Sequence, residues 1–509
     1  MKVRKLTVCH TCRARKLGCD GKRPSCSQCA GTKIECGGYQ YDLVFIPSQL
    51  SIGAPTKPKT RKDGKITKKQ RKCTTSQTNT STHASDELFH ESRPVIADAP
   101  CVVRPSLAWP FQDIISLVVQ NFSPTVLSSN SAFMNWDVDI HPRVCGAWIE
   151  LLPVLSLSRQ HEMALSSSVK ALGVSILARG RNGIAPISDA LTAHCLALHA
   201  LHDSLHDISR TADSDVLAVA IMCLMISELI LPTAVSSSAA HAAGLSDLIQ
   251  LHSPEAYSSG PSHRIFIGLR PAIIIHSIRN KHPTFLALPS WRTVPFQYVQ
   301  ANSFHALMTE ATVIPSILVD IDRLKYGLPG AKAPLAILGD LRDLLEALAN
   351  WNVSSPGLTN KPSFRVLGKI PNKAHLWFPD ITTANAMTHY WTFWIMCVIY
   401  IRKLRKNHPE LLDEDLLING EGPESPLITE MAIQMSTWVF QSIEYLMQDE
   451  MRLFGAISTM LPTRIAYQFL RCNHFYDREL LSWCERVIDG IRDRGYDYIA
   501  QYILDDDGV

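Results

Sequence analysis

The sequence predicts a mainly α-helical protein in three parts: a small cysteine-rich N-terminal module, a flexible linker and a large all-α domain. Three observations support this prediction. Six cysteines fall within the first 36 residues, a basic and then Ser/Thr-rich stretch follows, and from about Trp109 apolar residues recur at helical spacing. We place the three parts at 1–45, 46–105 and 106–509.

The N-terminal cysteines form a short sequence motif that occurs twice. Each unit has the spacing C-x2-C-x6-C, and the two units comprise Cys9, Cys12, Cys19 and then Cys26, Cys29, Cys36. Two tetrahedral zinc ions need about eight ligand positions, but the six cysteines supply only six sulfurs. Two sulfurs must therefore bind both metals, unless His10 or water fills a gap. A module this small cannot bury a core, so metal binding has to supply its folding free energy. The pattern predicts a site for two zinc ions per chain.

Two stretches of the module carry a family resemblance: Cys9-His-Thr-Cys-Arg-Ala-Arg-Lys-Leu-Gly-Cys-Asp20 and Lys22-Arg-Pro-Ser-Cys-Ser-Gln-Cys29. They resemble the fungal binuclear zinc-cluster transcription factors. The resemblance implies that Cys9 and Cys26 bridge the metals. It also implies that a helix starting near Cys12 enters the DNA major groove, usually over a CGG triplet. The expected protein is a nuclear regulator of genes transcribed by RNA polymerase II, and its expected partner is double-stranded DNA.

Basic residues of the module are the candidate DNA contacts. Arg and Lys donate to the O6 and N7 atoms of guanine, a pattern that is unique to the major groove. Lys16 is the first candidate for a base contact by its family position, and Arg15 is the second. Phosphate contacts, which position a protein without reading sequence, are expected from Arg13, Lys22 and Arg23. The alternative is a zinc module that binds protein, but such modules need no comparable basic density between their ligands.

The charge is divided between the two ends of the chain. The whole sequence has 50 Lys and Arg against 47 Asp and Glu. Residues 1–72 contain 18 of the basic residues and four of the acidic ones, which leaves 32 basic and 43 acidic residues for the remainder. A basic head on an acidic body predicts nucleic acid as the partner of the N-terminal part.

The predicted linker has the composition of a disordered segment. Lys57–Lys72 holds nine basic residues, and Thr74–Thr82 is almost entirely Thr, Ser, Asn and Gln. Within it, a short basic run is a candidate nuclear import signal or an arm that follows the DNA backbone, and the plainer alternative is a solvated linker. The run comprises Lys68, Lys69, Arg71 and Lys72.

The segment after the cysteines shows no coiled-coil pattern. Many relatives carry a heptad coiled coil there, but residues 37–105 show no sustained apolar repeat at a and d positions. We therefore expect the N-terminal part to bind DNA as a monomer. A homodimer would have to form through the C-terminal domain.

The C-terminal domain is predicted to be all-α, perhaps in two lobes, from the periodicity of its apolar residues. Leu165, Val169, Leu172 and Ile176 share one helix face, and a similar face runs through 338–348 after Pro334, which suits a first helical turn. Runs of alternating β-branched residues with tight turns are lacking. Further helices are predicted within 191–208, 214–231, 384–405, 430–448 and 478–494.

A second resemblance covers roughly residues 110–500. It is carried by Gly268–Ser277, Pro283–Pro295, Ile443–Leu446 and Met460–Tyr467. These stretches resemble the second type of fungal-specific transcription factor domain. The resemblance implies regulation of the DNA-bound protein, through contacts with the transcription machinery or co-regulators, and not catalysis.

An enzymatic function is not supported by the sequence. No G-x-x-x-x-G-K, H-E-x-x-H or G-x-S-x-G motif occurs in a suitable context, so we predict no catalytic residues. His199, His202 and His206 share a helix face and form a candidate metal site. We favour the alternative that they are the polar side of a helix whose apolar stripe is Leu198, Leu201 and Leu205. The aromatic cluster Tyr390, Trp391, Phe393 and Trp394 suggests a ligand pocket, but core packing explains it more simply.

Membrane association and a disulfide scaffold are also disfavoured. The apolar segments Val216–Leu231 and His389–Ile401 fall short of about 18 clean apolar residues, so we predict that both are buried core helices and that the protein has no membrane partner. The other cysteines lack paired spacing. A protein-interaction scaffold, or a repressor that does not read DNA directly, remains as the alternative function. Salt-dependent binding to duplex DNA separates the two hypotheses.

Overall fold

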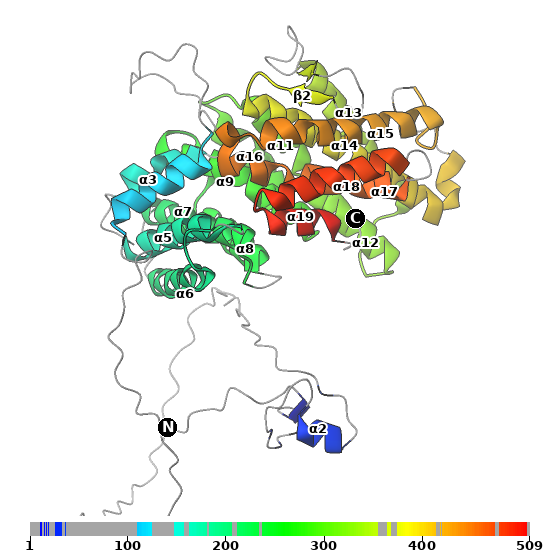
Figure 1. Cartoon of the computed structure of the whole chain (residues 1–509). Coiled ribbons are helices and arrows are strands. Elements are labelled where there is room, and N and C mark those ends of the chain that lie inside the picture. The colour runs from blue at the N-terminus through cyan, green and yellow to red at the C-terminus, as the bar shows by residue number, and fades with distance from the viewer. Residues whose placement is uncertain are drawn as a thin grey trace, which may run out of the picture. The chain divides into compact units, whose positions relative to one another are not determined.

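The computed structural model describes a small part of the cysteine-rich module and most of the C-terminal domain (Figure 1). The chain divides into two units, Met1–Pro94 and Val95–Val509. The predicted linker at 46–105 and its basic run lie outside the described residues. These residues are 11–12, 15, 17, 19, 26–32 and 36 in the first unit, and 109–124, 147–156, 162–180, 183–205, 211–233, 237–354, 364–367, 374–413, 418, 420–473 and 478–505 in the second.

The first unit contains one short described helix, α2 (Ser27–Gly31). Cys26 caps its N-terminus, where the sulfur accepts a hydrogen bond from the Cys29 amide. Thr11 and Cys12 are also helical, and the Arg15 amide donates to the Thr11 carbonyl at 3.1 Å, the i to i−4 bond of an α-helix. The helix expected near Cys12 is therefore present at its first turn.

The second unit is mainly helical, as predicted. Its α-helices are α3 (Phe111–Phe122), α4 (Leu152–Leu155), α5 (Glu162–Ala178), α6 (Ile187–Ser204), α7 (Thr211–Ile230), α8 (Ser237–Ile249), α9 (Gly260–Arg279), α10 (Pro289–Thr293), α11 (Ser303–Ala311), α12 (Ile314–Lys325), α13 (Pro334–Ser354), α14 (Ile381–Asn407), α15 (Pro426–Leu446), α16 (Arg452–Ser458), α17 (Met460–Cys472), α18 (Arg478–Asp493) and α19 (Asp497–Leu504). Short 3-10 helices are Ala147–Leu151, Pro254–Tyr257, Phe285–Ala287, Val294–Phe296, Pro409–Asp413 and Asp449–Met451.

All helices predicted from apolar periodicity in this unit are present. They correspond to α5, α6, α7, α13, α14, α15 and α18. The helix α13 begins at Pro334, where the missing amide of proline costs no helical hydrogen bond. The helix α6 ends at Ser204, which is earlier than expected.

A small pair of strands accompanies the helices of this unit. Two strands of three residues, β1 (Arg365–Leu367) and β2 (His375–Trp377), pair antiparallel with Val366 opposite Leu376. Leu376 is buried, while His375 and Trp377 are exposed on the other face. Strands this short contain too few residues for an alternating pattern to appear in the sequence.

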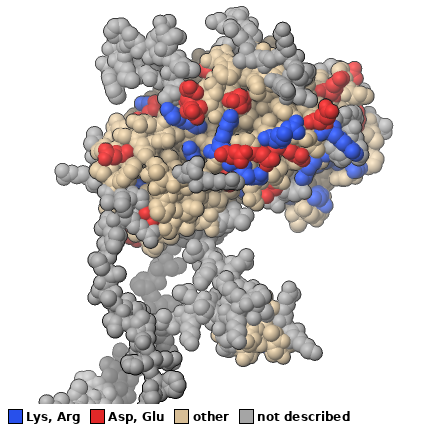
Figure 2. Space-filling view, viewed as in Figure 1, with Lys and Arg blue, Asp and Glu red and all other residues tan. Residues whose placement is uncertain are grey.

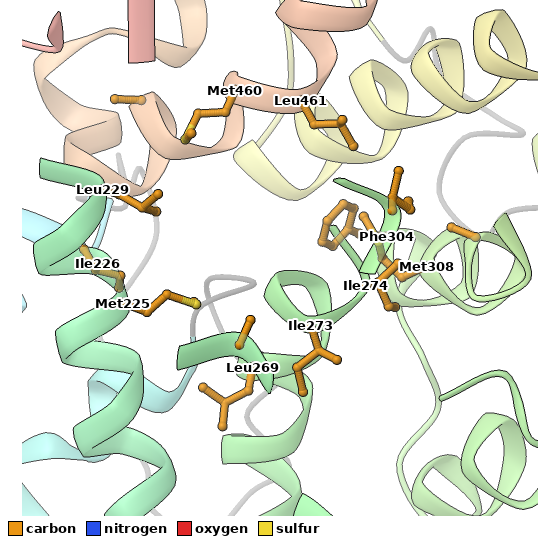
Figure 3. Close-up of a cluster of buried hydrophobic side chains, with 14 of the residues drawn as sticks. Met225, Ile226, Leu229, Leu269, Ile273, Ile274, Phe304, Met308, Met460 and Leu461 are labelled. Atoms are coloured by element: carbon orange, nitrogen blue, oxygen red, sulfur yellow. The ribbon is translucent and has the colours of Figure 1, made fainter. Parts of the chain in front are cut away.

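The helices enclose one continuous core. The helices α5, α6, α7 and α8 pack together, as do α13, α14, α15 and α17, and α9 and α11 lie between the two groups (Figure 1). Apolar side chains from α7, α9, α11 and α17 converge in the middle of the unit (Figure 3). A single buried cluster extends from Ile114 to Ile503, so the described residues share one core and do not form the two suggested lobes.

The helix α14 is buried on all sides and carries the aromatic cluster. Tyr390 stacks on Trp351 with ring centroids 5.3 Å apart, and Trp391 packs against Trp438 at 5.3 Å. Phe393 and Trp394 are also buried. These contacts are core packing between helices, as expected.

One described stretch is long and apolar enough to cross a membrane. This stretch is Ser303–Lys325, and most of its apolar part is buried inside the unit. Two residues in a turn interrupt this stretch between α11 and α12. The segments at 216–231 and 389–401 lie in α7 and α14 and are buried helices, as predicted.

The close approach of α16 to the end of α15 requires a glycine. A Cβ built on Gly455 would collide with the carbonyl oxygen of Leu446 and would lie 2.6 Å from Met451 Cβ. We expect Gly455→Ala to lower the free energy of unfolding by roughly 1–3 kcal/mol, because backbone has to move to make room. Urea unfolding of the full chain, followed by helical circular dichroism, measures this change.

Gly490 in α18 provides the matched control. A Cβ at this position meets nothing within 4 Å. Gly490→Ala should leave the stability unchanged or raise it by up to about 1 kcal/mol, since alanine favours helix more than glycine does. Equal stability of the two variants would contradict the steric explanation for Gly455.

Candidate metal centre

Three cysteines of the module converge on one buried point. The sulfur atoms of Cys12, Cys26 and Cys29 all lie within 4.8 Å of one another. All three side chains are buried, although the unit has no other described core. Cys19 and Cys36 are half-buried and pack against this group. Cys9, the remaining predicted ligand, lies outside the described residues.

The sulfur spacing fits zinc–thiolate coordination. Cys12 Sγ lies 3.6 Å from Cys26 Sγ and 3.9 Å from Cys29 Sγ. Two thiolates on one tetrahedral zinc are roughly 3.8 Å apart, given a Zn–S bond of about 2.3 Å. A disulfide would need a separation of about 2.05 Å. The donor set therefore suits a zinc ion, which would hold the thiolates together and replace a hydrophobic core.

The backbone of α2 makes a hydrogen bond to the sulfur of Cys26. The Cys29 amide donates to Cys26 Sγ at 3.3 Å, within the first turn of α2. This hydrogen bond fixes the position of the Cys26 sulfur at the N-terminus of α2. Cys12 and Cys29 occupy equivalent positions in the two sequence repeats, so the structure brings a ligand from each repeat to the same point as Cys26.

Arg15 is the one predicted DNA contact that the structure describes. Its side chain is exposed, and a guanidinium nitrogen lies 3.4 Å from Thr32 Oγ1, to which it donates. Thr32 follows α2 in the second repeat, so this contact links the two halves of the module. Arg13, Lys16, Lys22 and Arg23 lie outside the described residues.

The histidine face of α6 is polar surface, in agreement with the favoured interpretation. His199 and His202 are exposed, and His199 Nδ1 lies 2.7 Å from the Cys195 carbonyl of its own helix. His206 lies outside the described residues. The predicted apolar stripe is partly wrong, because Leu205 is 41% exposed just beyond the helix end. The buried face instead contains Ala193, His194, Ala197 and Leu201.

His194 belongs to a buried polar group that sequence reasoning missed. Donor atoms of His194 on α6, Glu228 on α7 and His241 on α8 lie within 4.8 Å of one another. His194 Nε2 is 2.9 Å from Glu228 Oε1. The carboxylate also accepts from the Thr233 amide and hydroxyl at 2.7 and 2.6 Å and from the Ser237 hydroxyl at 2.7 Å.

Through these hydrogen bonds, the Glu228 carboxylate holds the connection between α7 and α8. Burial alone would raise the pKa of Glu228, but the hydrogen bonds from His194, Thr233 and Ser237 outweigh it and lower the pKa to about 2. The ionised carboxylate therefore has its acceptor positions filled by the loop it stabilises. The three residues lie on three consecutive helices and meet only through tertiary packing, so spacing along the chain could not have identified the group.

Comparison with known proteins identifies the class of the metal centre. Residues 7–42 match the family described as the fungal Zn(2)-Cys(6) binuclear cluster domain. The chain thus carries a zinc-binding domain of the class found in fungal DNA-binding transcription regulators. Among curated proteins and among solved structures, no match to the chain is found.

Proposed function

We propose that the protein is a nuclear, sequence-specific regulator of genes transcribed by RNA polymerase II. In this proposal, the six cysteines hold two zinc ions, with Cys9 and Cys26 as bridging ligands, and the module reads a CGG-like triplet in duplex DNA. The observation that carries the proposal is the thiolate-like spacing of Cys12, Cys26 and Cys29 inside the segment that matches the zinc-cluster family.

The proposed division of labour follows the charge of the chain. Residues 1–45 bind DNA, 46–105 form a linker whose run Lys68, Lys69, Arg71 and Lys72 directs nuclear import, and 106–509 regulate the bound protein. Figure 2 shows Lys and Arg intermixed with Asp and Glu on the displayed face of the helical unit. Mixed charges of this kind repel a phosphate backbone about as much as they attract it. The basic module is accordingly the better candidate for DNA binding.

The helical unit is proposed to act through other proteins. Its resemblance to the second type of fungal-specific transcription factor domain suggests co-regulators or the transcription machinery as partners, and a homodimer would form through this unit. The alternative function is a zinc-module scaffold or a repressor without direct DNA reading. A scaffold has no reason to bind duplex DNA with an affinity that falls steeply with salt.

Lys16→Ala tests whether the module reads bases. A direct base contact contributes about 1–3 kcal/mol of discrimination, so this variant should lose its preference for the CGG-like triplet and keep salt-sensitive affinity for any duplex. Selection of bound sequences from randomised DNA, with the zinc content measured in parallel, checks the result. The zinc content should stay unchanged, because Lys16 is not a ligand.

Lys22→Ala and Arg23→Ala provide matched comparisons. As proposed phosphate contacts, they should weaken binding to all sequences alike and reduce the salt slope by roughly one each. If Lys16→Ala keeps the wild-type preference and Arg15→Ala loses it, Arg15 is the reading residue. If neither change alters the preference, the helix does not read bases and the proposal is wrong.

A further inference from the structure

The helical unit encloses an apolar cavity that the DNA-binding proposal does not use. The cavity has a volume of about 120 Å³ and lies among α3, α7, α9, α11, α14, α16, α17 and α19. Most of its wall is apolar, including Met225, Ile226, Leu229, Phe304, Met460 and Leu461, which surround the central space in Figure 3. A dry cavity of roughly this size, lined by aliphatic and aromatic side chains, can hold a benzene-sized molecule.

Three buried polar atoms, from residues that line this cavity, have no hydrogen-bond partner among the described residues. They are His276 Nδ1 on α9 and, on α14, Asn385 Oδ1 and His389 Nε2. All three residues are less than 10% exposed. An unsatisfied buried polar atom costs about 1–3 kcal/mol, so three beside one cavity require an explanation.

The hydrogen-bonding character of these atoms is determined by their neighbours. His389 Nδ1 lies 2.8 Å from the Asn385 carbonyl oxygen, which can only accept, so Nδ1 carries the proton. Burial lowers the pKa of His389 to about 4, so the ring is neutral at pH 7 and Nε2 is an acceptor. Asn385 Oδ1 is also an acceptor, one helical turn away. Two acceptors on α14 thus lie on residues of the cavity wall without a donor among the described residues, and a donor on a molecule in the cavity would satisfy them.

The charge around the cavity favours a neutral occupant. Burial and the charge of Arg279 lower the pKa of His276 to about 4, so this ring is neutral as well. Arg279, the cation at the wall, already donates to the Tyr498 hydroxyl at 3.3 Å and lies 4.8 Å from the centre of the Tyr502 ring. An anion that entered the cavity would lose its hydration and would face an apolar wall and two acceptors that cannot donate to it. Binding of an anion is therefore unfavourable.

We propose that this cavity is a binding site for an uncharged, mainly apolar small molecule that carries a hydrogen-bond donor, such as a hydroxyl group, placed against Asn385 and His389. Methionine side chains in the wall can adjust to ligands of different shape. Control of the DNA-bound protein by such a ligand rests on the function proposed above. Binding of the ligand to the cavity does not depend on that function.

Three matched probes test this site in the full chain: benzyl alcohol, toluene and benzoate. Ligand-observed NMR titrations should show saturable binding of benzyl alcohol about fivefold to tenfold tighter than toluene, as expected for one added hydrogen bond, and weakest binding of benzoate. Absence of saturable binding for both neutral probes would overturn the proposal, since the cavity would then be closed or filled by water. Tighter binding of benzoate would overturn the neutral-ligand assignment.

Variants on α14 locate the binding site. His389→Phe keeps an aromatic ring but removes the acceptor, so the ratio of the benzyl alcohol and toluene affinities should fall to about one. Asn385→Leu should also reduce this ratio and serves if His389→Phe fails to fold by circular dichroism. The control His199→Phe changes an exposed histidine of α6 and should keep the wild-type ratio. An unchanged ratio in both folded α14 variants would overturn the proposed site, whatever the DNA experiments show.

Discussion

Replacement of Cys26 by serine is expected to unfold the N-terminal module and abolish specific DNA binding by the full chain. Cys26 is completely buried, its sulfur lies 3.6 Å from Cys12 Sγ, and it is a proposed ligand of both metals. Structural zinc sites in small modules supply about 10–16 kcal/mol of apparent binding free energy, which is also the folding free energy. Loss of a bridging ligand should therefore release both ions.

Elemental analysis of the purified full chain measures this effect. Wild type should contain two zinc ions per chain, and Cys26→Ser and Cys9→Ser close to none. The control is Cys195→Ser, because Cys195 is an exposed cysteine of α6 in the other unit. It should keep the full zinc content. One zinc per chain in intact wild type would contradict the binuclear site.

The helical unit is expected to lose stability steeply as the pH falls from about 6.5 to 4. Burial lowers the pKa of several histidines, which stay neutral in the folded state. The lowered values are about 4 for His241, His276 and His389 and about 3 for His305. In the unfolded chain a histidine has a pKa of about 6.5, so it binds a proton below this pH while the same histidine in the folded chain stays neutral. The unfolded state thus binds more protons in this window, so stability rises with pH.

The expected loss is large because the histidine effects add. Each of the four contributes roughly 1–2 kcal/mol of destabilisation between pH 7 and pH 5. Asp215 opposes them, since burial raises its pKa to about 6 and its protonated form favours the folded state in part of the same range. Glu228, whose pKa is lowered from 4.5 to about 2, adds to the loss mainly at the acidic end, where the unfolded carboxyl takes up a proton before the folded one does. The histidines therefore dominate by number.

Urea unfolding of the full chain at pH 7, 6 and 5 checks this expectation. Far-ultraviolet circular dichroism reports mainly on the helical unit, so loss of zinc from the small module contributes little to the signal. The midpoint should fall at each step for wild type and equally for His202→Ala, whose histidine is exposed. A midpoint that is constant from pH 7 to 5 would show that the buried histidines do not control stability.

The sequence was most informative where local patterns determine structure. The cysteine spacing indicated the metal centre, since ligands of a small module must lie close in the chain, and Cys12, Cys26 and Cys29 do meet. Helices with one apolar face, such as α13, were found from their 3.6-residue period. The faces of α3 (Ile114, Ile115, Val118 and Phe122) and of α17 follow the same rule and were missed.

Other elements leave too little local signal to be predicted. The helix α9 contains Pro271 and buries residues around its whole circumference, so it shows neither clean helix propensity nor one apolar face. The cavity and the group of His194, Glu228 and His241 depend on tertiary packing. Asn385 and His389 are one turn apart on α14, but only the arrangement of α9 and α17 around them creates a space for a ligand.

The central claim is that zinc held by the cysteine module makes this protein a DNA-binding regulator. Its most direct test is to remove zinc stepwise from the full chain with a chelator while measuring the zinc content and the affinity for a duplex with a CGG triplet. The affinity should fall in proportion to the zinc lost, return when zinc is restored, and decrease with rising salt in the loaded protein. Unchanged duplex affinity at zero zinc, or a fully zinc-loaded chain that does not bind duplex DNA, would contradict the claim.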